Sequence, residues 1–573
     1  MAVLPMLGWL AFAGWLGFVA LVLALRYLVL PSIGDYRERI EVAVSQAVGQ
    51  TVRVGKIDAY WRGLNPELVL NDLSLLDSAG EAAFTLRQVD GVLSWESLWR
   101  GRLVLDLLVF ERPVLHVRRD VQGRISVAGM ASEGESDPAF LDWVLAQKRI
   151  RIHDASIVWE DALRQAPPLI LEDLQFGLDN QGKMHRFGLS AAPPAELAAR
   201  IDLRGEVEGD IHQALEQFAG RLYLELAYAD LAGWSAWIDY PVDLPQGRGG
   251  LRLWGDLEDG AGRLVTDLAL ESVQLRLGPK LPLLDLESLR GRLQASYSAS
   301  AWSVAAKQLA LVTRDHIQLV PMDFQLDWRQ KDTAVDGQFK ANLLDLDVLA
   351  RLAGYLPLDD RSRRLLHDYA PQGRIGELQT RWTWRDEALQ RYALSGNFAE
   401  LGVRAVGYLP GAQGLSGKID ANETGGSLML DTQQAGLSLP AVFPEPDIAF
   451  DRLQARVAWR NLAEEIAVDI EKLAFSGPDA TGEAHGNYRY TGKGPGLIDL
   501  QATIDRADGR AVWRYMPHVV NADARTWLKY GILAGTGYDA KLILRGDLYD
   551  FPFREPSTGK FLVTAKARDV VVD

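Results

Sequence analysis

The sequence predicts a mainly β protein, built on an elongated and twisted antiparallel sheet with a few short helices. Many segments alternate apolar and polar residues, as 498–505 does. A period of two places all the apolar side chains of a strand on one face. Segments with a helical period are few. Because 48% of the residues are hydrophobic and 24% are charged, the composition is that of a folded chain.

The N-terminal segment 1–31 is predicted to be a transmembrane anchor. Its apolar stretch, Leu7–Leu30, is interrupted only by Arg26. As a helix it would be about 36 Å long, enough to cross a bilayer core of about 30 Å. A cleaved signal peptide is the alternative, but the stretch is too long, and it lacks a basic start and a small-x-small cleavage site.

Charge next to this segment gives a prediction of its orientation. Arg26, Arg37 and Arg39 all lie on its C-terminal side. The positive-inside rule therefore places the large domain in the cytoplasm, although long domains can be exported regardless of such charges.

The rest of the chain divides by its periodicity. Segment 32–130 is predicted to form a short amphipathic helix, with Ile40 and Val44 on one side, followed by strands. Segment 131–148 is predicted to be a flexible loop or helix, because 129–140 is small, acidic and rich in turn residues. Segment 149–573 is predicted to be the β body.

Two segments of the β body have helical character, near 344–371 and 508–535. Each is expected to contain short helices separated by a proline, Pro357 in the first and Pro517 in the second. They are too small to cover the apolar side of a long sheet.

Alternation selects the residues expected on the apolar side of the sheet. They come from four segments that alternate clearly. The candidates are Leu289, Leu293, Ala295, Tyr297, Ile466, Val468, Ile470, Ile498, Leu500, Ala502, Ile504, Leu542 and Leu544.

A Leu-x-Gly-x-apolar motif recurs without a fixed spacing, beginning at Leu203, Leu253, Leu394, Leu415 and Leu544. Glycine inside a strand often marks a bulge or bend, so these sites are expected to increase the coiling of the sheet. The sequence ends with a strand-like alternation, "AKARDVVVD". Because natural proteins rarely leave such an edge uncovered, we expect the chain to be truncated at its C-terminus.

Charge and residue usage exclude several functions. The net charge of −15 and the lack of a basic run argue against a nucleic-acid partner. Since the chain has no cysteine, it has no disulfide, thiolate metal site or cysteine nucleophile. No motif for a catalytic triad, a zinc protease or a nucleotide site occurs. The sequence therefore predicts no enzyme, no cofactor and no metal.

The function depends on what covers the apolar side of the sheet. Two sheets could pack face to face, one sheet could close into a barrel, or the side could stay open as a groove. An open apolar surface of this extent needs a hydrocarbon ligand, and acyl chains of lipids are the natural candidate. Alternation alone leaves the three options open.

Several segments resemble a known family. Segment 40–77, "IEVAVSQAVGQTVRVGKIDAYWRGLNPELVLNDLSLLD", and segment 97–129 resemble the AsmA-like proteins of Gram-negative envelopes. Segment 394–434 and segment 512–548, "VWRYMPHVVNADARTWLKYGILAGTGYDAKLILRGDL", are similar to the YhdP branch of that family. The resemblance covers nearly the whole chain, and members of that branch are considerably longer.

The resemblance implies an open hydrophobic β-groove, anchored in the inner membrane by the N-terminal helix, with the bulk of the chain in the periplasm. It implies a bridge that conducts phospholipids toward the outer membrane, with the outer membrane or envelope proteins as partners at the far end. It overrides the orientation expected from charge. The alternative function is that of a structural or assembly factor for outer-membrane proteins.

Overall fold

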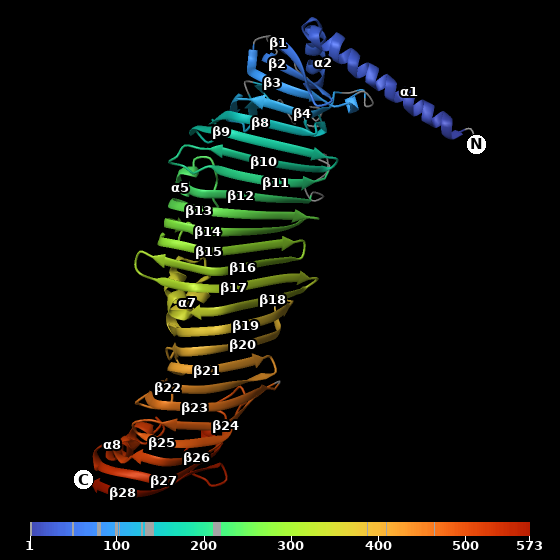
Figure 1. Ribbon diagram of the computed structural model, residues 1–573. Coiled ribbons are helices and arrows are strands. Elements are labelled where there is room, and N and C mark those ends of the chain that lie inside the picture. The colour runs from blue at the N-terminus through green and yellow to red at the C-terminus, as the bar shows by residue number, and fades with distance from the viewer. Residues whose placement is uncertain are drawn as a thin grey trace. The chain divides into compact units, whose positions relative to one another are not determined.

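The computed structural model describes residues 3–48, 51–76, 82–97, 101, 103–127, 130–131, 143–209, 219–386, 388–407, 409–462 and 464–573. The chain divides into two compact units, Met1–Gln274 and Leu275–Asp573. The structure confirms a mainly β fold with few helices, in which the sheet is antiparallel except at one strand and is not closed (Figure 1).

The elements of unit 1 are α1 (Val3–Ala24), η1 (Leu25–Val29), η2 (Leu30–Tyr36), α2 (Arg37–Val48), β1 (Val52–Arg62), β2 (Asn65–Leu76), β3 (Ala82–Leu93), β4 (Leu105–Glu111), β5 (Val114–Arg119), β6 (Ile125–Val127), β7 (Met130–Ala131), β8 (Arg149–Asp161), β9 (Ala166–Gln181), β10 (Met184–Ala192), β11 (Ile201–Glu208), β12 (Ala219–Asp230), α5 (Leu231–Trp234), β13 (Asp243–Glu258) and β14 (Ala261–Arg276), the last of which ends just past the boundary.

The elements of unit 2 are β15 (Leu284–Ser298), β16 (Ala301–Thr313), β17 (Gln318–Lys331), β18 (Ala334–Asp345), α6 (Leu346–Leu352), η4 (Ala353–Tyr355), α7 (Asp360–Tyr369), β19 (Gln372–Arg385), β20 (Ala388–Val403), β21 (Gly411–Asn422), β22 (Gly425–Ser438), β23 (Asp447–Asn461), β24 (Ile466–Ser476), β25 (Ala480–Tyr490), β26 (Leu497–Asp508), η5 (Gly509–Tyr515), α8 (Ala522–Gly531), β27 (Ile532–Asp547), η6 (Leu548–Asp550) and β28 (Gly559–Val572).

The N-terminal apolar helix is present as α1, which η1 and η2 join to α2. Its 22 residues give a length of about 33 Å. Among the described residues, the helical segment that contains α1 has the length and composition needed to cross a membrane. Most of the predicted flexible segment 131–148 lies outside the described residues, although 143–146 is helical.

The first strands of unit 1 have their apolar side covered by helices. Val54, Ile57 and Leu70 belong to a buried core. Ile40 and Val44 of α2 pack against this core, as does the helical turn at 143–146. Glu41 of α2 also accepts a hydrogen bond of 2.8 Å from the backbone N–H of Val54, which fixes the helix on β1.

Strand pairing in unit 1 departs from the predicted antiparallel pattern at β8. The first half of β8 pairs in parallel with β4, and its second half pairs in parallel with β5. Between β4 and β5 the Arg112 N–H donates to the His153 carbonyl, and Pro113 accepts from Ser156. Proline has no N–H to offer a ladder, so it suits this junction between two strands.

Unit 2 is an antiparallel sheet in which each strand pairs with the next along the chain. The pairing runs without interruption from β15 to β28. No pairing joins β28 back to β15 in the described part of the chain, so the sheet of unit 2 is not a barrel. With a spacing of about 4.8 Å per strand, the stack of fourteen strands measures about 60 Å.

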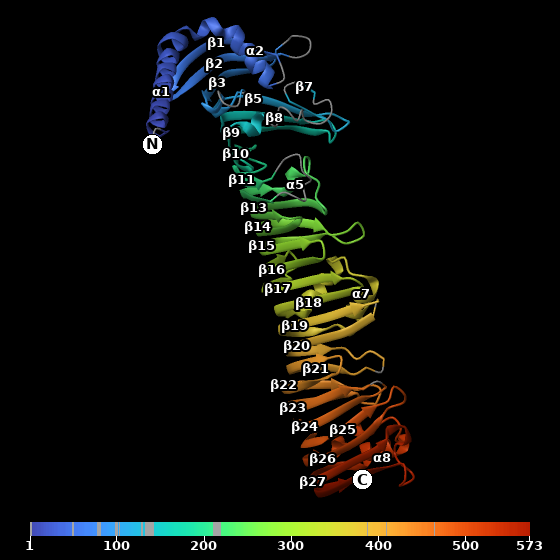
Figure 2. The same ribbon diagram turned by 90° about the vertical axis from the view of Figure 1, so that its right-hand side faces the viewer.

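Helices occur in both predicted helical segments of unit 2. Helices α6 and α7 connect β18 to β19, and η5 and α8 connect β26 to β27. Figure 2 shows α7 and α8 beside the strand ends at the same side of the sheet of this unit. The carboxylates of Asp345 and Asp359 accept backbone hydrogen bonds at the starts of α6 and α7, which stabilises these short helices.

Tyr515, at the end of η5, gives a pH-dependent prediction. Burial raises the pKa of Tyr515 to about 12, and the negative charge of Asp479 and the hydrogen bond of 3.1 Å to it act in the same direction. The unfolded chain ionises this phenol near pH 10, so the folded state holds the proton more tightly. This contribution to stability is complete below pH 10 and is lost between about pH 10 and 12.

We therefore expect the free energy of unfolding to fall less between about pH 10 and 12 in Tyr515→Phe than in the wild type. Denaturant titration at the two pH values measures this difference. The same pH dependence in both proteins would show that the phenol contributes nothing.

Register shifts in the sheet occur next to polar residues in the left-handed region of backbone conformation. Gln308, Glu377, Glu400 and Asp539 have φ values between 47° and 55°. Each lies where two strands change register. Such bulges bend a strand and increase its twist.

The prediction that the glycine motif marks the bulges is wrong at Gly205. This residue pairs in regular register with Phe187 and Leu222. An added Cβ would lie only 2.3 Å from the ring of Phe187. The glycine therefore makes room for a ring that lies across it.

Candidate functional site

The apolar face of unit 2 is the candidate site, and its side chains lie in rows that cross the sheet. Directly paired residues of neighbouring antiparallel strands point to the same side. The longest row runs from β15 to β28 through Ala295, Val304, Leu326, Phe339, Thr380, Leu394, Ala421, Gly426, Trp459, Val468, Tyr488, Ile498, Gly546 and Gly559. Apart from the hydroxyl groups of Thr380 and Tyr488, this row is apolar from one end to the other.

Two further rows lie beside it, one beyond the other on the same side, over the C-terminal half of the unit. The first runs through Gly396, Ile419, Leu428, Val457, Ile470, Gly486, Leu500, Leu544 and Phe561. The second runs through Phe398, Gly417, Leu430, Ala455, Leu473, Ala484, Ala502, Leu542 and Val563. Since rows are about 7 Å apart along a strand, three rows make a band wide enough for two acyl chains side by side.

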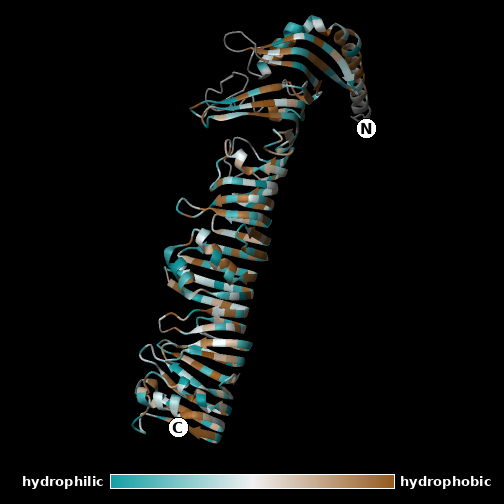
Figure 3. Cartoon of the chain, turned by 90° about the vertical axis from the view of Figure 1, so that its left-hand side faces the viewer, coloured by the Kyte–Doolittle hydropathy of each residue, from teal (hydrophilic) through white to brown (hydrophobic). Residues whose placement is uncertain are grey.

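A row of aromatic residues runs beside the longest row over the N-terminal half of the unit. It runs through Tyr297, Trp302, Trp328, Gly337, Trp382 and Tyr392. The rings of Trp302 and Trp328 stack with centroids 5.8 Å apart and an angle of 14° between their planes. Figure 3 shows the resulting bands of hydrophobic and hydrophilic residues along the strands.

The candidate residues from the sequence lie on this face. Ala295, Val468 and Ile498 lie in the longest row, and Leu293, Ile470, Leu500, Ala502, Leu542 and Leu544 lie in or in line with the two further rows. Tyr297 begins the aromatic row. Ile466 pairs with Tyr490, Ile504 pairs with Gly482 and Ala540, and Leu289 pairs with Leu311 beyond a register shift. Their contact with lipid remains a proposal.

Residues missed from the sequence include Trp302, Leu326, Trp328, Phe339 and Leu428. The alternation at 324–328 was available as a signal for the β17 residues. Gly337 and Gly426 break the apolar pattern of their strands, so their place in the rows follows only from the register.

Among the described residues, no second protein layer covers this face as a sandwich would. Trp302, Val304 and Phe561 are 41%, 38% and 44% exposed. Inner residues of a sandwich would be almost fully buried. Of the three options for the apolar side, the open sheet is the one that agrees with the structure.

Several aromatic rings lie flat across glycines on this face. An added Cβ at Gly337 would lie 2.1 Å from Trp382, and one at Gly426 would lie 2.5 Å from Trp459. The rings thus fill the space that a side chain would occupy.

Gly337→Ala should lower the free energy of unfolding by about 1–3 kcal/mol, because the new methyl group displaces the Trp382 ring. Denaturant titration measures this loss. In a Trp382→Ala background the loss should disappear. Gly396→Ala is the matched control, since its Cβ would be at an ordinary 3.5 Å from Leu378. An equal loss with and without Trp382 would contradict the packing of the ring on the glycine.

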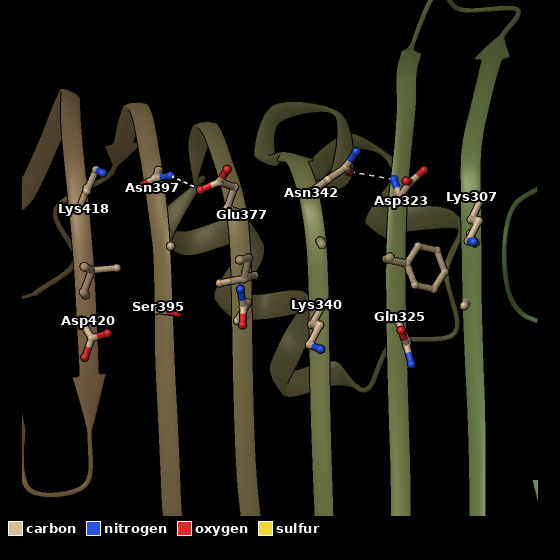
Figure 4. Close-up of a pocket in the computed structure, with 18 of the residues that line it drawn as sticks. Lys307, Asp323, Gln325, Lys340, Asn342, Glu377, Ser395, Asn397, Lys418 and Asp420 are labelled. Atoms are coloured by element: carbon tan, nitrogen blue, oxygen red, sulfur yellow. Dashed lines mark hydrogen bonds between the residues drawn. The ribbon is translucent and has the colours of Figure 1, made fainter.

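The opposite face of the same strands is polar. It contains a shallow hollow of about 800 Å³ whose lining includes Lys307, Asp323, Lys340, Glu377 and Lys418 (Figure 4). The Asn397 side-chain amide donates to Glu377 over 2.9 Å, and the Asp323 backbone N–H donates to Asn342 over 2.8 Å. These charged and amide groups favour water, so the hollow does not suit an acyl chain. Within the described residues no cluster of His, Asp or Glu is arranged to hold a metal ion.

Comparison with known proteins gives independent evidence about the family of this chain. The family model described as YhdP protein matches residues 1–573. The intermembrane phospholipid transporter YhdP of Escherichia coli (strain K12) is 22% identical over 572 residues. The match covers 95% of this chain but 43% of the relative, so the chain spans less than half of the relative's length. No solved structure matches significantly.

Proposed function

This chain belongs to the YhdP protein family, and from that premise we propose that it conducts phospholipids along the apolar face of its sheet. The observation that carries the proposal is the row from Ala295 to Gly559, which crosses all fourteen strands of unit 2. Most of its side chains are at least partly exposed, although Ala421 is buried, and they are in register from strand to strand. The name of the relative, a phospholipid transporter, agrees with this use of the face.

The proposed mechanism is passive. Moving a phospholipid through water exposes about 30 methylene groups at about 0.8 kcal/mol each, a cost of roughly 24 kcal/mol. On the apolar face the acyl chains stay in contact with hydrocarbon, and the headgroup stays in water. Because bilayer and apolar face solvate the chains similarly, the protein lowers the barrier without creating a deep trap. A lipid gradient then sets the direction of flow.

The proposed location is the inner membrane, with α1 as a single-pass anchor and the bulk of the chain in the periplasm. The length and apolar character of α1 support the anchor. The intermembrane role named for the relative supports the periplasmic side, and we propose a path toward the outer membrane. This location is the opposite of the one expected from Arg26, Arg37 and Arg39.

Mass spectrometry of gently purified full chain tests the function. The proposal predicts that phospholipids co-purify and that their amount falls when the apolar face is made polar. The rival role, as an assembly factor for outer-membrane proteins, predicts a stoichiometric protein partner and no phospholipid. A variant with a substitution on the polar face is the control and should retain as much phospholipid as the wild type. If a variant with a polar substitution at Leu500 also retained the same amount, that result would count against the proposal.

A further inference from the structure

Unit 1 carries an aromatic tip where β1 turns into β2 and β3 ends, formed by the exposed Tyr60 and Leu64 and the half-buried Trp61 and Trp95. Leu64 is 71% exposed and Tyr60 is 56% exposed. The indole N–H of Trp95 donates to the Leu64 carbonyl over 3.3 Å, which joins the two parts of the tip. Large apolar groups this exposed at a turn indicate a docking surface.

The tip contacts the apolar helix α1 and the residues just after it. The rings of Phe18 and Trp95 meet edge to face with centroids 5.0 Å apart. The guanidinium of Arg26 lies 6.0 Å from the ring of Trp61. These two contacts hold the C-terminal third of α1 beside the tip.

We propose that the aromatic tip inserts into the leaflet of the membrane that holds the C-terminal end of α1. This inference rests on the proposed role of α1 as an anchor. Phe18 lies six residues before the end of α1, about 9 Å along its axis. Trp95, in contact with Phe18, then lies at a similar depth, which matches the 5–10 Å reached by interfacial apolar groups.

The polar groups at the tip fit a headgroup layer. Arg26 is exposed and has no carboxylate partner in the part of the chain that the structure describes. A lipid phosphate would supply the anionic partner that the Arg26 guanidinium lacks.

The charges behind the tip do not oppose insertion. Arg62 pairs with Glu67 at 2.8 Å, and Lys148 pairs with Glu96 at 2.8 Å. Paired charges cost less to bring near the bilayer than isolated ones. Tyr and Trp are also the residues that favour the membrane–water interface. The membrane is therefore a better occupant of this surface than a second protein.

The experiment uses the natural absence of cysteine in the chain. Leu64→Cys carries an environment-sensitive fluorophore on the full chain, reconstituted into vesicles of phosphatidylethanolamine and phosphatidylglycerol. Val121→Cys is the matched control, because Val121 is a similarly exposed apolar residue at another turn of unit 1. Lipids with a nitroxide on the acyl chain quench fluorophores that reach the bilayer.

We expect the emission at position 64 to shift to shorter wavelength and to be quenched several-fold more than at position 121. Equal quenching at both positions in protein that floats with the vesicles overturns the docking of the tip and leaves the anchor intact. A shift without quenching indicates that position 64 is buried against protein, such as a second copy of this chain, and also overturns it. Protein that does not float with the vesicles overturns the anchor, and this inference with it.

Discussion

Leu500→Asp should slow phospholipid transfer by roughly 100-fold while the protein stays folded. Leu500 lies between Gly486 and Leu544 in a row of the apolar face. A carboxylate there meets every acyl chain that passes, and an Asp in hydrocarbon costs about 2.5–3.5 kcal/mol. Because the side chain is half-exposed, the folded protein can still hydrate the charge when no lipid is present. Transfer of a fluorescent phospholipid between donor and acceptor vesicles measures the rate.

Gln501→Asp is the matched control for this variant. It adds the same charge one residue away, on the polar face, where Gln501 is exposed. Leu500→Asn, polar but uncharged, should slow transfer less than Leu500→Asp. Normal transfer by a folded Leu500→Asp protein would show that this row does not carry acyl chains.

Leu326→Asp should slow transfer as much as Leu500→Asp, although the two residues lie nine strands apart, on β17 and β26. If lipids pass along the rows one after another, each charge is a barrier in series. The double variant should then be slower than either single variant by only about twofold, because times for successive barriers add.

If the two positions acted independently on one step, their free-energy losses would add. The double variant would then be slower than the wild type by roughly 10,000-fold. A strong additional loss in the double variant, or an effect confined to one of the two positions, would contradict a continuous path. Circular dichroism and thermal unfolding of each variant distinguish a blocked path from a damaged fold.

The sequence was most informative about which residues share a face. A strict period of two is a local property, so Leu293, Val468, Leu500 and Leu542 could be selected as apolar positions before the structure. The N-terminal apolar helix was predictable for the same reason, since its length and lack of charge are local.

Properties that depend on pairing between strands were not predictable. The alternation at 498–504 is the same whether a second sheet, a barrel or a lipid covers it. The register decides that Gly337 lies beneath Trp382 and that Gly426 lies beneath Trp459. The parallel pairing of β8 depends on contacts between distant segments, and no local pattern indicates it.

The bulges show the same limit in another form. Polar residues such as Glu377 and Asp539 lie at the bulges. In the sequence they cannot be distinguished from polar residues on the polar face of a regular strand. Their left-handed conformation is set by the change of register between the strands. The bulges were predicted at the glycine motif instead, but Gly205 in this motif makes room for an aromatic ring.

The most direct test of the account is photo-crosslinking on β26. Leu500 and Ala502 lie on the apolar face, whereas Asp499 and Gln501 lie on the other, where Arg545 donates to Asp499 over 2.8 Å. A photo-reactive amino acid at each position in turn, in intact cells, reports what touches it. The account predicts phospholipid adducts at 500 and 502 and few or none at 499 and 501. Equal capture of lipid at all four positions, or capture of this chain's own residues at 500 and 502, would contradict it.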